Sequence, residues 1–258
     1  MGTQSNGGST AAGTSVQPTG RNDTHSSALI AEKKDHQQLK LVGIDIAADV
    51  LRIFASCFER RNILVMIERP GEEPQQNGEF VSACAVAINS NAVASFKSMP
   101  RFADGRGLTF GIGSEQQMLT FPNIGVNVLL DECTESNIHA AIDKTAPLLG
   151  RNMTPHDRIP IVTRMSLDTG TVSLNGLTLN LGHGGMAVRL RRATDLPRRV
   201  RITWSLQGAN QISLEATPRW HSGRTVGLQY VSAAPDALKK WLRTYSVRLA
   251  VTPVIPHR

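Results

Sequence analysis

The chain lacks the features that mark membrane proteins and exported proteins. It has no apolar run close to the roughly eighteen residues that a membrane helix needs. Its N-terminus has no basic segment followed by an apolar core, so we expect no secretory signal. Its cysteines, Cys57, Cys84 and Cys133, are scattered without the CxxC or Cys/His spacing of a zinc site. These absences predict a protein of the reducing cytoplasm that inserts into no membrane.

Motifs of known catalytic sites are missing as well. The sequence contains no GxSxG elbow, P-loop or HExxH pair, and no GxGxxG in a strand–helix setting. The glycines around Arg106 are typical of a loop and not of a phosphate cradle. We therefore expect a protein that is not an enzyme and that holds no metal and no cofactor.

Acidic residues are scarce in only one half of the chain. From Arg151 onward there are 16 Lys and Arg against 5 Asp and Glu, a balance of +11, whereas residues 1–150 hold 12 against 16, a balance of −4. The contrast indicates an anionic partner for the second half. Two oppositely charged domains that simply remain soluble would give the same pattern, so charge alone leaves both interpretations open.

The first 150 residues divide into a tail and an α/β domain. Residues 1–36 are rich in Gly, Ser, Thr, Asn and Gln, which predicts a disordered tail. In residues 37–150, short apolar runs alternate with helical patterns, which predicts a mostly parallel sheet covered on both faces. The expected strands are Leu39–Ile46, Asn62–Ile67, Val81–Ile88, Leu108–Ile112 and Val126–Leu130, and the expected helices are Ala48–Arg60, Asn91–Met99 and Glu135–Leu149. A polar loop, Pro70–Gly78, stands where a helix would join the second and third strands.

After residue 150 the pattern changes to closely spaced strands. The six β-like runs are Ile161–Leu167, Thr171–Leu179, Met186–Leu190, Val200–Leu206, Ile212–Trp220 and Val226–Val231. Gly-bearing turns separate several of them, which favours an antiparallel barrel or sandwich across residues 151–250. A helix beginning near Pro235 carries an apolar stripe that we expect to pack on the barrel, and residues 251–258 form a final tail. Trp204 and Trp220 lie in strands and are expected in the core.

One segment of the barrel region carries a recognisable motif. Residues 179–188 read Leu-Asn-Leu-Gly-His-Gly-Gly-Met-Ala-Val and resemble the PilZ family motif: Asp or Asn, any residue, Ser, two residues, Gly. Asn180 and Gly185 match, while Gly182 replaces the serine. The family's RxxxR pair has its second arginine at Arg158; the first position falls on Thr154, and Arg151 lies nearby at the wrong spacing.

The PilZ resemblance implies a β-barrel with a terminal helix that binds cyclic di-GMP. Arginine can form paired hydrogen bonds to phosphate or guanine, and asparagine can donate to and accept from a guanine edge. His183 could contact a base or be an exposed turn residue, and the glycines could serve backbone geometry alone. The ligand-binding residues expected from the resemblance are Arg151, Arg158, Asn180, Gly182, His183 and Gly185.

The preceding α/β region resembles a response-regulator receiver domain that has lost its chemistry. Asp45 is the only acid near the first position of a receiver's acidic cluster. The third strand ends at Asn89, and an amide cannot form an aspartyl phosphate. The fifth strand is followed by Asp131 and Glu132 and not by a lysine. We therefore expect a degenerate receiver-like domain without phosphotransfer.

These features support three functions. The first is a signalling protein in which a pseudo-receiver precedes a PilZ domain that senses cyclic di-GMP. The second is a degenerate PilZ adaptor that binds a protein and no nucleotide, because Thr154 and Gly182 lack the family's side chains. The third, less favoured, is a basic nucleic-acid-binding module. Its basis is the run Arg189, Arg191, Arg192, Arg198, Arg199 and Arg201, which could equally be a solvated face.

Overall fold

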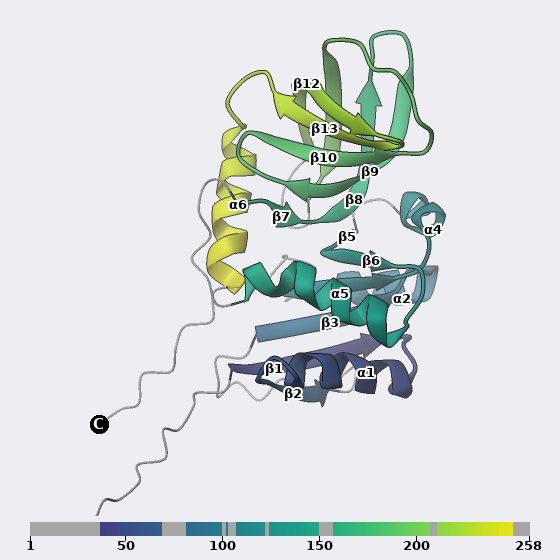
Figure 1. Ribbon diagram of the computed structural model, residues 1–258, viewed down its shortest axis with the longest axis vertical. Coiled ribbons are helices and arrows are strands. Elements are labelled where there is room, and N and C mark those ends of the chain that lie inside the picture. The colour runs from purple at the N-terminus through teal and green to yellow at the C-terminus, as the bar shows by residue number, and fades with distance from the viewer. Residues whose placement is uncertain are drawn as a thin grey trace, which may run out of the picture. The chain divides into compact units, whose positions relative to one another are not determined.

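A five-stranded, all-parallel sheet forms the first part of the protein (Figure 1). The computed structural model describes residues 37–68, 81–99, 102, 107–121, 124–149, 157–206 and 211–249. In the order in which they pair, the strands are β2 (Ile63–Glu68), β1 (Gln37–Ile44), β3 (Val81–Ala87), β4 (Leu108–Ile112) and β6 (Val128–Leu130). Counting only these strands, the order 2-1-3-4-5 is the flavodoxin-like order of doubly wound folds. The prediction of a parallel α/β sheet is confirmed.

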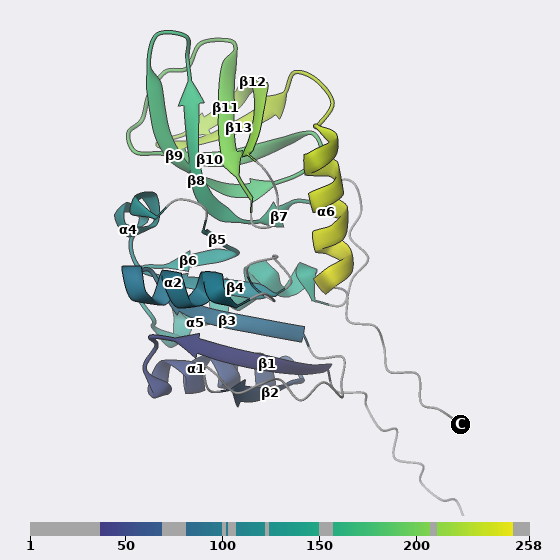
Figure 2. The same cartoon turned by 180° about the vertical axis from the view of Figure 1, so that it is seen from behind.

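Helices cover both faces of this sheet. Helices α1 (Ala48–Glu59) and α5 (Glu135–Thr145) contact each other and lie in front of the sheet in Figure 1. A short 3₁₀ helix, Ala146–Leu148, continues α5. Helix α2 (Ser90–Ser98) contacts β3 and β1 and lies in front in Figure 2. The helical spacing of the buried face of α1 (Leu51, Phe54, Cys57 and Phe58) explains why this segment is a helix.

The run predicted as one strand, Val126–Leu130, is divided between two sheets. Gly125–Val126 forms β5, which pairs antiparallel with the barrel strand β8 (Val162–Asp168), and only β6 joins the parallel sheet. The two strands are separated at the buried residue Asn127, whose backbone and side chain both form hydrogen bonds with Thr109 of β4. An apolar run predicts burial but does not reveal which sheet receives each residue, so the single-strand prediction was wrong.

A short helix after β4 was not expected from the sequence. Helix α4 spans Glu115–Thr120 and is too short to give a clear apolar period. It begins with a capping box, in which the Ser114 hydroxyl accepts from the Gln117 N–H and the Gln117 side chain accepts from the Ser114 N–H. That Ser-x-x-Gln pattern is the signal by which the helix could have been found.

The second part is a closed, six-stranded antiparallel barrel. Its strands pair in the order β8, β11 (Val200–Ser205), β12 (Gln211–Ser222), β13 (Thr225–Tyr230), β10 (Gly185–Leu190) and β9 (Ser173–Leu181), and pairing of β9 with β8 closes the ring. The short strands β5 and β7 (Ile159–Pro160) extend it. The six predicted β-runs are confirmed as these six strands, within a few residues at their ends.

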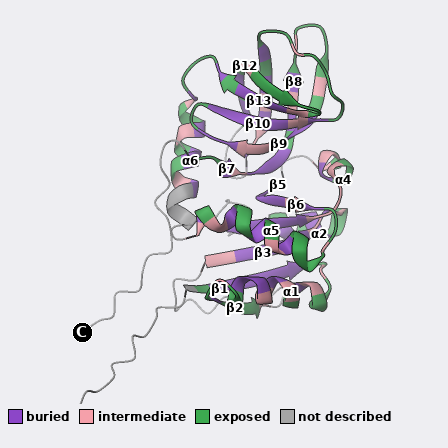
Figure 3. Cartoon of the chain, in the orientation of Figure 1, coloured by how far each residue is buried: buried purple, intermediate pink, exposed green. Residues whose placement is uncertain are grey.

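The final helix and the core join the two parts. Helix α6 spans Asp236–Leu249, and its predicted apolar stripe is buried: Leu238, Trp241, Leu242 and Tyr245. One apolar cluster includes Phe110 of the parallel sheet and Val188 and Trp204 of the barrel, so Trp204 lies in the core as predicted. The buried residues run through both parts in Figure 3. The two parts therefore share a hydrophobic core.

Several predictions concern residues outside this description. They are the tails at 1–36 and 251–258, the loop Pro70–Gly78, Arg151, and the consequence of Thr154 in the first arginine position. In the part of the chain that is described, no helix combines the length and apolarity needed to cross a bilayer.

Candidate functional site

The predicted motif forms the hairpin between β9 and β10. Asn180 ends the strand β9 together with Leu181, residues 182–184 form the motif loop, and Gly185 begins β10. The Gly182 N–H donates to the Gly185 carbonyl at 2.9 Å and closes the loop. The Tyr230 N–H donates to the Gly184 carbonyl at 3.0 Å, which ties the loop to β13. Backbone hydrogen bonds therefore fix the loop in place.

The structure brings Arg158 and Asn180 together, although 22 positions separate them. Strand β7 pairs with β9 so that Ile159 lies opposite Leu181, which places the preceding Arg158 beside the motif. The Arg158 Nη1 donates to the Asn180 Oδ1 at 3.0 Å. The same oxygen accepts from the Ala187 N–H at 3.2 Å. Because its oxygen is occupied, Asn180 can offer a ligand its amide N–H₂ as a donor.

Gly182 leaves room where the family motif has a serine. An added Cβ at this position would lie 3.3 Å from the Arg158 Cγ and 3.6 Å from the nearest backbone oxygens. Arg158 therefore passes over Gly182, and a serine hydroxyl would stand beside its side chain. His183 is exposed at the tip of the motif loop.

A cavity of about 340 Å³ opens beside the motif loop. We name it the motif pocket. It contains two arginines from different parts of the barrel, Arg158 and Arg219, and the Trp220 indole. Arg219 Nε donates to the Gln229 Oε1 at 2.5 Å, which holds its guanidinium at the pocket. The residues that line the pocket are Arg158, Gly182, His183, Gly184, Gly185, Arg219, Trp220, Gly227, Leu228 and Gln229.

Trp220 is 50% exposed, so its prediction as a core residue was wrong. Along β12 the even-numbered residues from Ile212 to Ala216 point inward, and simple alternation would bury Trp220 too. The pairing of β12 with β13 shifts between Pro218 and Trp220, which is a β-bulge at Arg219. One extra residue reverses the side on which the following side chain lies. The proline inside the strand was the available signal of this irregularity.

Gly227 provides the surface on which Trp220 lies. A Cβ at this position would meet the Trp220 Nε1 at 2.1 Å, so only glycine admits the indole so close to β13. Ring atoms of Trp220 lie directly over Gly227, and half of the side chain is exposed to solvent. An exposed aromatic face flanked by guanidinium groups can stack on a nucleobase. Sequence reasoning missed Arg219, Trp220 and Gln229 as site residues.

Tyr230 lies close enough to Arg158 for the positive charge of the guanidinium to affect the pKa of its phenol. Burial raises the pKa of the Tyr230 phenol, and the positive charge of Arg158 lowers it by less. The phenol therefore stays protonated and neutral near neutral pH.

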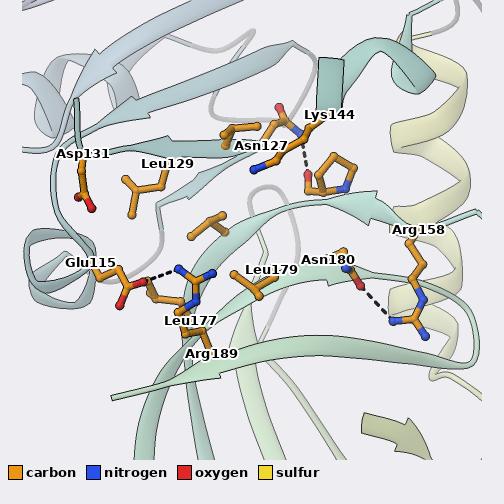
Figure 4. Close-up of a pocket in the computed structure, with 13 residues that line it drawn as sticks. Glu115, Asn127, Leu129, Asp131, Lys144, Arg158, Leu177, Leu179, Asn180 and Arg189 are labelled. Carbon is orange, nitrogen blue, oxygen red and sulfur yellow. Dashed lines mark hydrogen bonds and ion pairs between the residues drawn. The ribbon is translucent and has the colours of Figure 1, made fainter. Parts of the chain in front are cut away.

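A second cavity, of about 420 Å³, lies between the parallel sheet and the barrel (Figure 4). Its floor is aliphatic and includes Leu129, Leu177 and Leu179. Arg158 and Asn180 line one end of this cavity. Arg158 also lines the motif pocket, and Asn180 adjoins that pocket through its hydrogen bond to Arg158. The Arg158–Asn180 pair thus lies between the motif pocket and the second cavity.

At the other end of this cavity, Glu115 joins helix α4 to the barrel. It accepts hydrogen bonds from Arg189 at 2.6 Å and from Arg224 at 3.0 Å. Burial by itself would raise the pKa of Glu115, but the hydrogen bonds and charges of the two arginines hold it below its ordinary value. The contribution of this cluster to stability is therefore present at neutral pH and lost as the pH falls through that lowered pKa.

The predicted run of arginines does not form one free basic face. Arg189 is paired with Glu115, and Arg191 donates to Gln116 at 3.3 Å. Arg199 and Arg201 both lie within 4.0 Å of Glu215 on the neighbouring strand. Internal contacts therefore take up much of this run.

The edge of the parallel sheet at which the sequence predicts a degenerate receiver-like site holds an aspartate–asparagine pair. The Asn89 Nδ2 donates to the Asp45 Oδ2 at 2.6 Å, while the Asn89 Oδ1 accepts from the Ala92 N–H and caps α2. Asn89 therefore has a structural role at this position. Across the described residues, no cluster of three His, Cys, Asp or Glu side chains is placed to hold a metal ion.

Comparison with solved structures finds several proteins that are similar to part of this chain. The PilZ domain of CeSA, from a cellulose-synthesizing bacterium, is 22% identical, with a TM-score of 0.29 over 34% of this chain and 94% of that one. The Bacillus subtilis inhibitor of motility (MotI/DgrA) is 22% identical, with a TM-score of 0.30 over 35% of this chain and 47% of that one. An uncharacterized Legionella protein is 14% identical, with a TM-score of 0.25 over 36% and 94%.

The family comparison concerns the same part of the chain. No curated protein matches the sequence. The model of the PilZ domain family matches residues 155–248, which span β7 to α6 and include Arg158 and the motif hairpin. The predicted motif, the closed barrel and the final helix therefore agree with this match, and the C-terminal part of the chain, residues 155–248, is a PilZ domain.

Proposed function

We propose that this protein is a non-enzymatic signalling protein whose PilZ domain binds cyclic di-GMP at the motif pocket. The observation that carries the proposal is the convergence of Arg158, Arg219 and the exposed Trp220 on the loop that holds the motif. Cyclic di-GMP has two phosphates and two guanines, so a site for it needs cationic donors and a flat apolar surface. Both are present in the motif pocket.

Each group has a distinct task in this proposal. A guanidinium has five N–H donors, so Arg158 can keep its bond to Asn180 and still donate to a phosphate. Arg219, held through its Nε, keeps its two terminal nitrogens for a second anionic oxygen or a guanine edge. The open face of Trp220 stacks on a guanine. Gly182, which has no side chain, leaves the backbone of the loop accessible to the ligand.

Calorimetric titration with cyclic di-GMP tests the proposal. We expect the wild-type chain to bind with a dissociation constant in the micromolar range, and Arg158→Ala to weaken binding about tenfold or more, because a charge-assisted bond of about 1.5–3 kcal/mol is lost. Arg201→Ala is the matched control: Arg201 is exposed, lies near Glu215 and does not line the motif pocket. Absence of heat with the wild-type chain at about 500 μM ligand would reject the proposal.

Restoring the family serine is expected to strengthen binding. Gly182→Ser should lower the dissociation constant about fivefold, since a new hydroxyl hydrogen bond contributes about 1 kcal/mol. The substitution meets only the flexible Arg158 Cγ at 3.3 Å, so the fold can accept it. Gly184→Ser, where an added Cβ meets nothing within 4 Å, is the control and should leave the affinity unchanged. Equal affinities for all three proteins would show that position 182 does not touch the ligand.

The adaptor hypothesis makes a different prediction for the same surface. The occupied oxygen of Asn180 and the missing hydroxyl at Gly182 favour it, because both reduce the groups available to a nucleotide. In that case the titration shows no heat, and Trp220→Ala abolishes binding of a protein partner. The nucleic-acid hypothesis has less support, because internal contacts take up much of the arginine run.

A further inference from the structure

The second cavity, between the parallel sheet and the barrel, is separate from the motif pocket, although Arg158 lines both. Its volume of about 420 Å³ is in the range of small-molecule sites. Figure 4 shows its aliphatic floor, Leu129, Leu177 and Leu179, between Glu115 at one end and Arg158 at the other. The cavity therefore combines an apolar surface with charged groups at its two ends.

Leu179 reaches this cavity through an irregularity in strand β9. The register of β9 against β10 shifts between Ala187 and Val188 and leaves Leu179 without a paired residue on β10, so Leu179 is the extra residue of a β-bulge. It is only partly buried, and neither of the two apolar clusters formed by described residues includes it. Bulges are frequent beside functional sites, where they change the direction of a side chain. The fold thus presents to the cavity a leucine that the core does not use.

The two ends of the cavity differ in charge. At one end Arg189 forms an ion pair with Glu115, and Asp131 lies on the same side in Figure 4. Arg158 and Lys144 also line the cavity, and neither of them forms an ion pair with a residue that the structure describes. Positive charge at the cavity therefore exceeds the negative charge that the described chain supplies.

The sequence next to Arg158 does not correct this imbalance. Residues 150–156 precede Arg158 and lie outside the described ranges. They include Arg151 and His156 but no Asp or Glu. The single hydrogen bond from Arg158 to the neutral Asn180 leaves its charge uncompensated. An anion is therefore the ligand that this end of the cavity favours.

We propose that the second cavity binds an amphipathic monoanion, a molecule with an alkyl chain and one carboxylate. The alkyl chain lies on the leucine floor, because burial of its CH₂ groups favours binding. The carboxylate lies at Arg158 and Lys144, since a guanidinium forms paired hydrogen bonds with a carboxylate and keeps donors beyond the one that Asn180 accepts. This inference does not depend on cyclic di-GMP binding at the motif pocket.

Calorimetric titration of the full chain with decanoate tests the site. We expect a dissociation constant on the order of 100 μM in a titration that reaches about 2 mM decanoate. Decylammonium has a similar chain with a cationic group, and acetate has the carboxylate without the chain, so neither should bind in this range. Absence of binding by decanoate would overturn the proposal, and so would equal binding by decylammonium or acetate. A failed titration with cyclic di-GMP would leave this result unaffected.

Two substitutions that avoid the motif pocket test the assigned groups. Lys144→Ala should weaken decanoate binding about threefold, through the loss of an exposed charge. Leu179→Gln should weaken it about tenfold, because a polar group replaces part of the floor. Lys240→Ala is the matched control: Lys240 is an exposed lysine of α6 that does not line the cavity, and this variant should bind like the wild type. Equal affinities for all of these proteins would contradict the proposal.

Methyl NMR spectra locate the bound molecule independently of any substitution. Decanoate should shift the methyl signals of Leu177 and Leu179, which line the second cavity, and leave those of Leu228, which lines the motif pocket. Shifts confined to Leu228 would place decanoate in the motif pocket and overturn the assignment.

Discussion

Replacing Gly185 by alanine is expected to destabilise the protein by about 3 kcal/mol. An added Cβ would lie 2.2 Å from the Leu228 carbonyl oxygen and 3.2 Å from the Gln229 Cα. Both are backbone atoms of β13, so no side-chain rotation can relieve the clash. Gly185 pairs with Gln229 in the barrel, and the two strands must separate to admit even a methyl group. The final glycine of the motif is therefore a requirement of the barrel itself.

Urea unfolding measures this effect, with the neighbouring glycine as control. At Gly184 an added Cβ meets nothing within 4 Å, so Gly184→Ala should change the free energy of unfolding by about 0.5 kcal/mol or less. The two variants differ only in which glycine receives a methyl group. Equal stabilities of Gly184→Ala and Gly185→Ala would mean that β10 and β13 are not as close as the structure places them.

Replacing Asn127 by alanine is expected to cost about 3 kcal/mol or more, because it leaves several buried groups unpaired. The Asn127 Oδ1 accepts from the Thr109 N–H at 2.8 Å. Its Nδ2 donates to the Pro160 carbonyl at 2.9 Å and to the Tyr245 hydroxyl at 2.5 Å. One side chain thus joins β4 of the parallel sheet, β7 of the barrel and the helix α6.

A double-mutant cycle separates the parts of this network. Tyr245→Phe removes one hydrogen bond and should cost about 1 kcal/mol, since the Nδ2 of Asn127 keeps its bond to Pro160. The double variant should be less destabilised than the sum of the single variants, because the residues are in contact. Additive losses, or a loss below about 1 kcal/mol in Asn127→Ala, would contradict the assigned role.

The sequence predicts the position of the motif well, but it predicts only some of the residues that line the motif pocket. Asn180 and Arg158 were named from the PilZ pattern, and the structure places them 3.0 Å apart. Arg219 and Trp220 belong to no motif and reach the same pocket through a bulge. Periodicity predicts the side on which a strand residue lies only while the alternation is unbroken, so it placed Trp220 in the core. The bulge in the pairing of β12 with β13, the next strand of the same hairpin, decides otherwise.

The run of arginines between Arg189 and Arg201 shows that the sequence is also limited in what it predicts about charge. Sequence counting gives a basic second half but cannot say which arginines meet a carboxylate. Glu115, from the acidic first half, accepts from Arg189 and Arg224, and this contact spans more than 70 positions of the chain. The charge asymmetry of the two halves is therefore partly used to hold the parallel-sheet part and the barrel together.

The sequence by itself determined most of the local elements, the parallel sheet, the six antiparallel strands that follow residue 150 and the glycine motif, because these depend on periodicity and on residues near one another in the chain. Only the tertiary structure decided the role of Asn127, the exposure of Trp220 and the place of β2 in the sheet. The role of Asn127 and the place of β2 in the sheet depend on contacts between residues far apart in the chain, which leave little trace in any single segment. The exposure of Trp220 depends on a bulge within the β12–β13 hairpin, which strand alternation alone does not show.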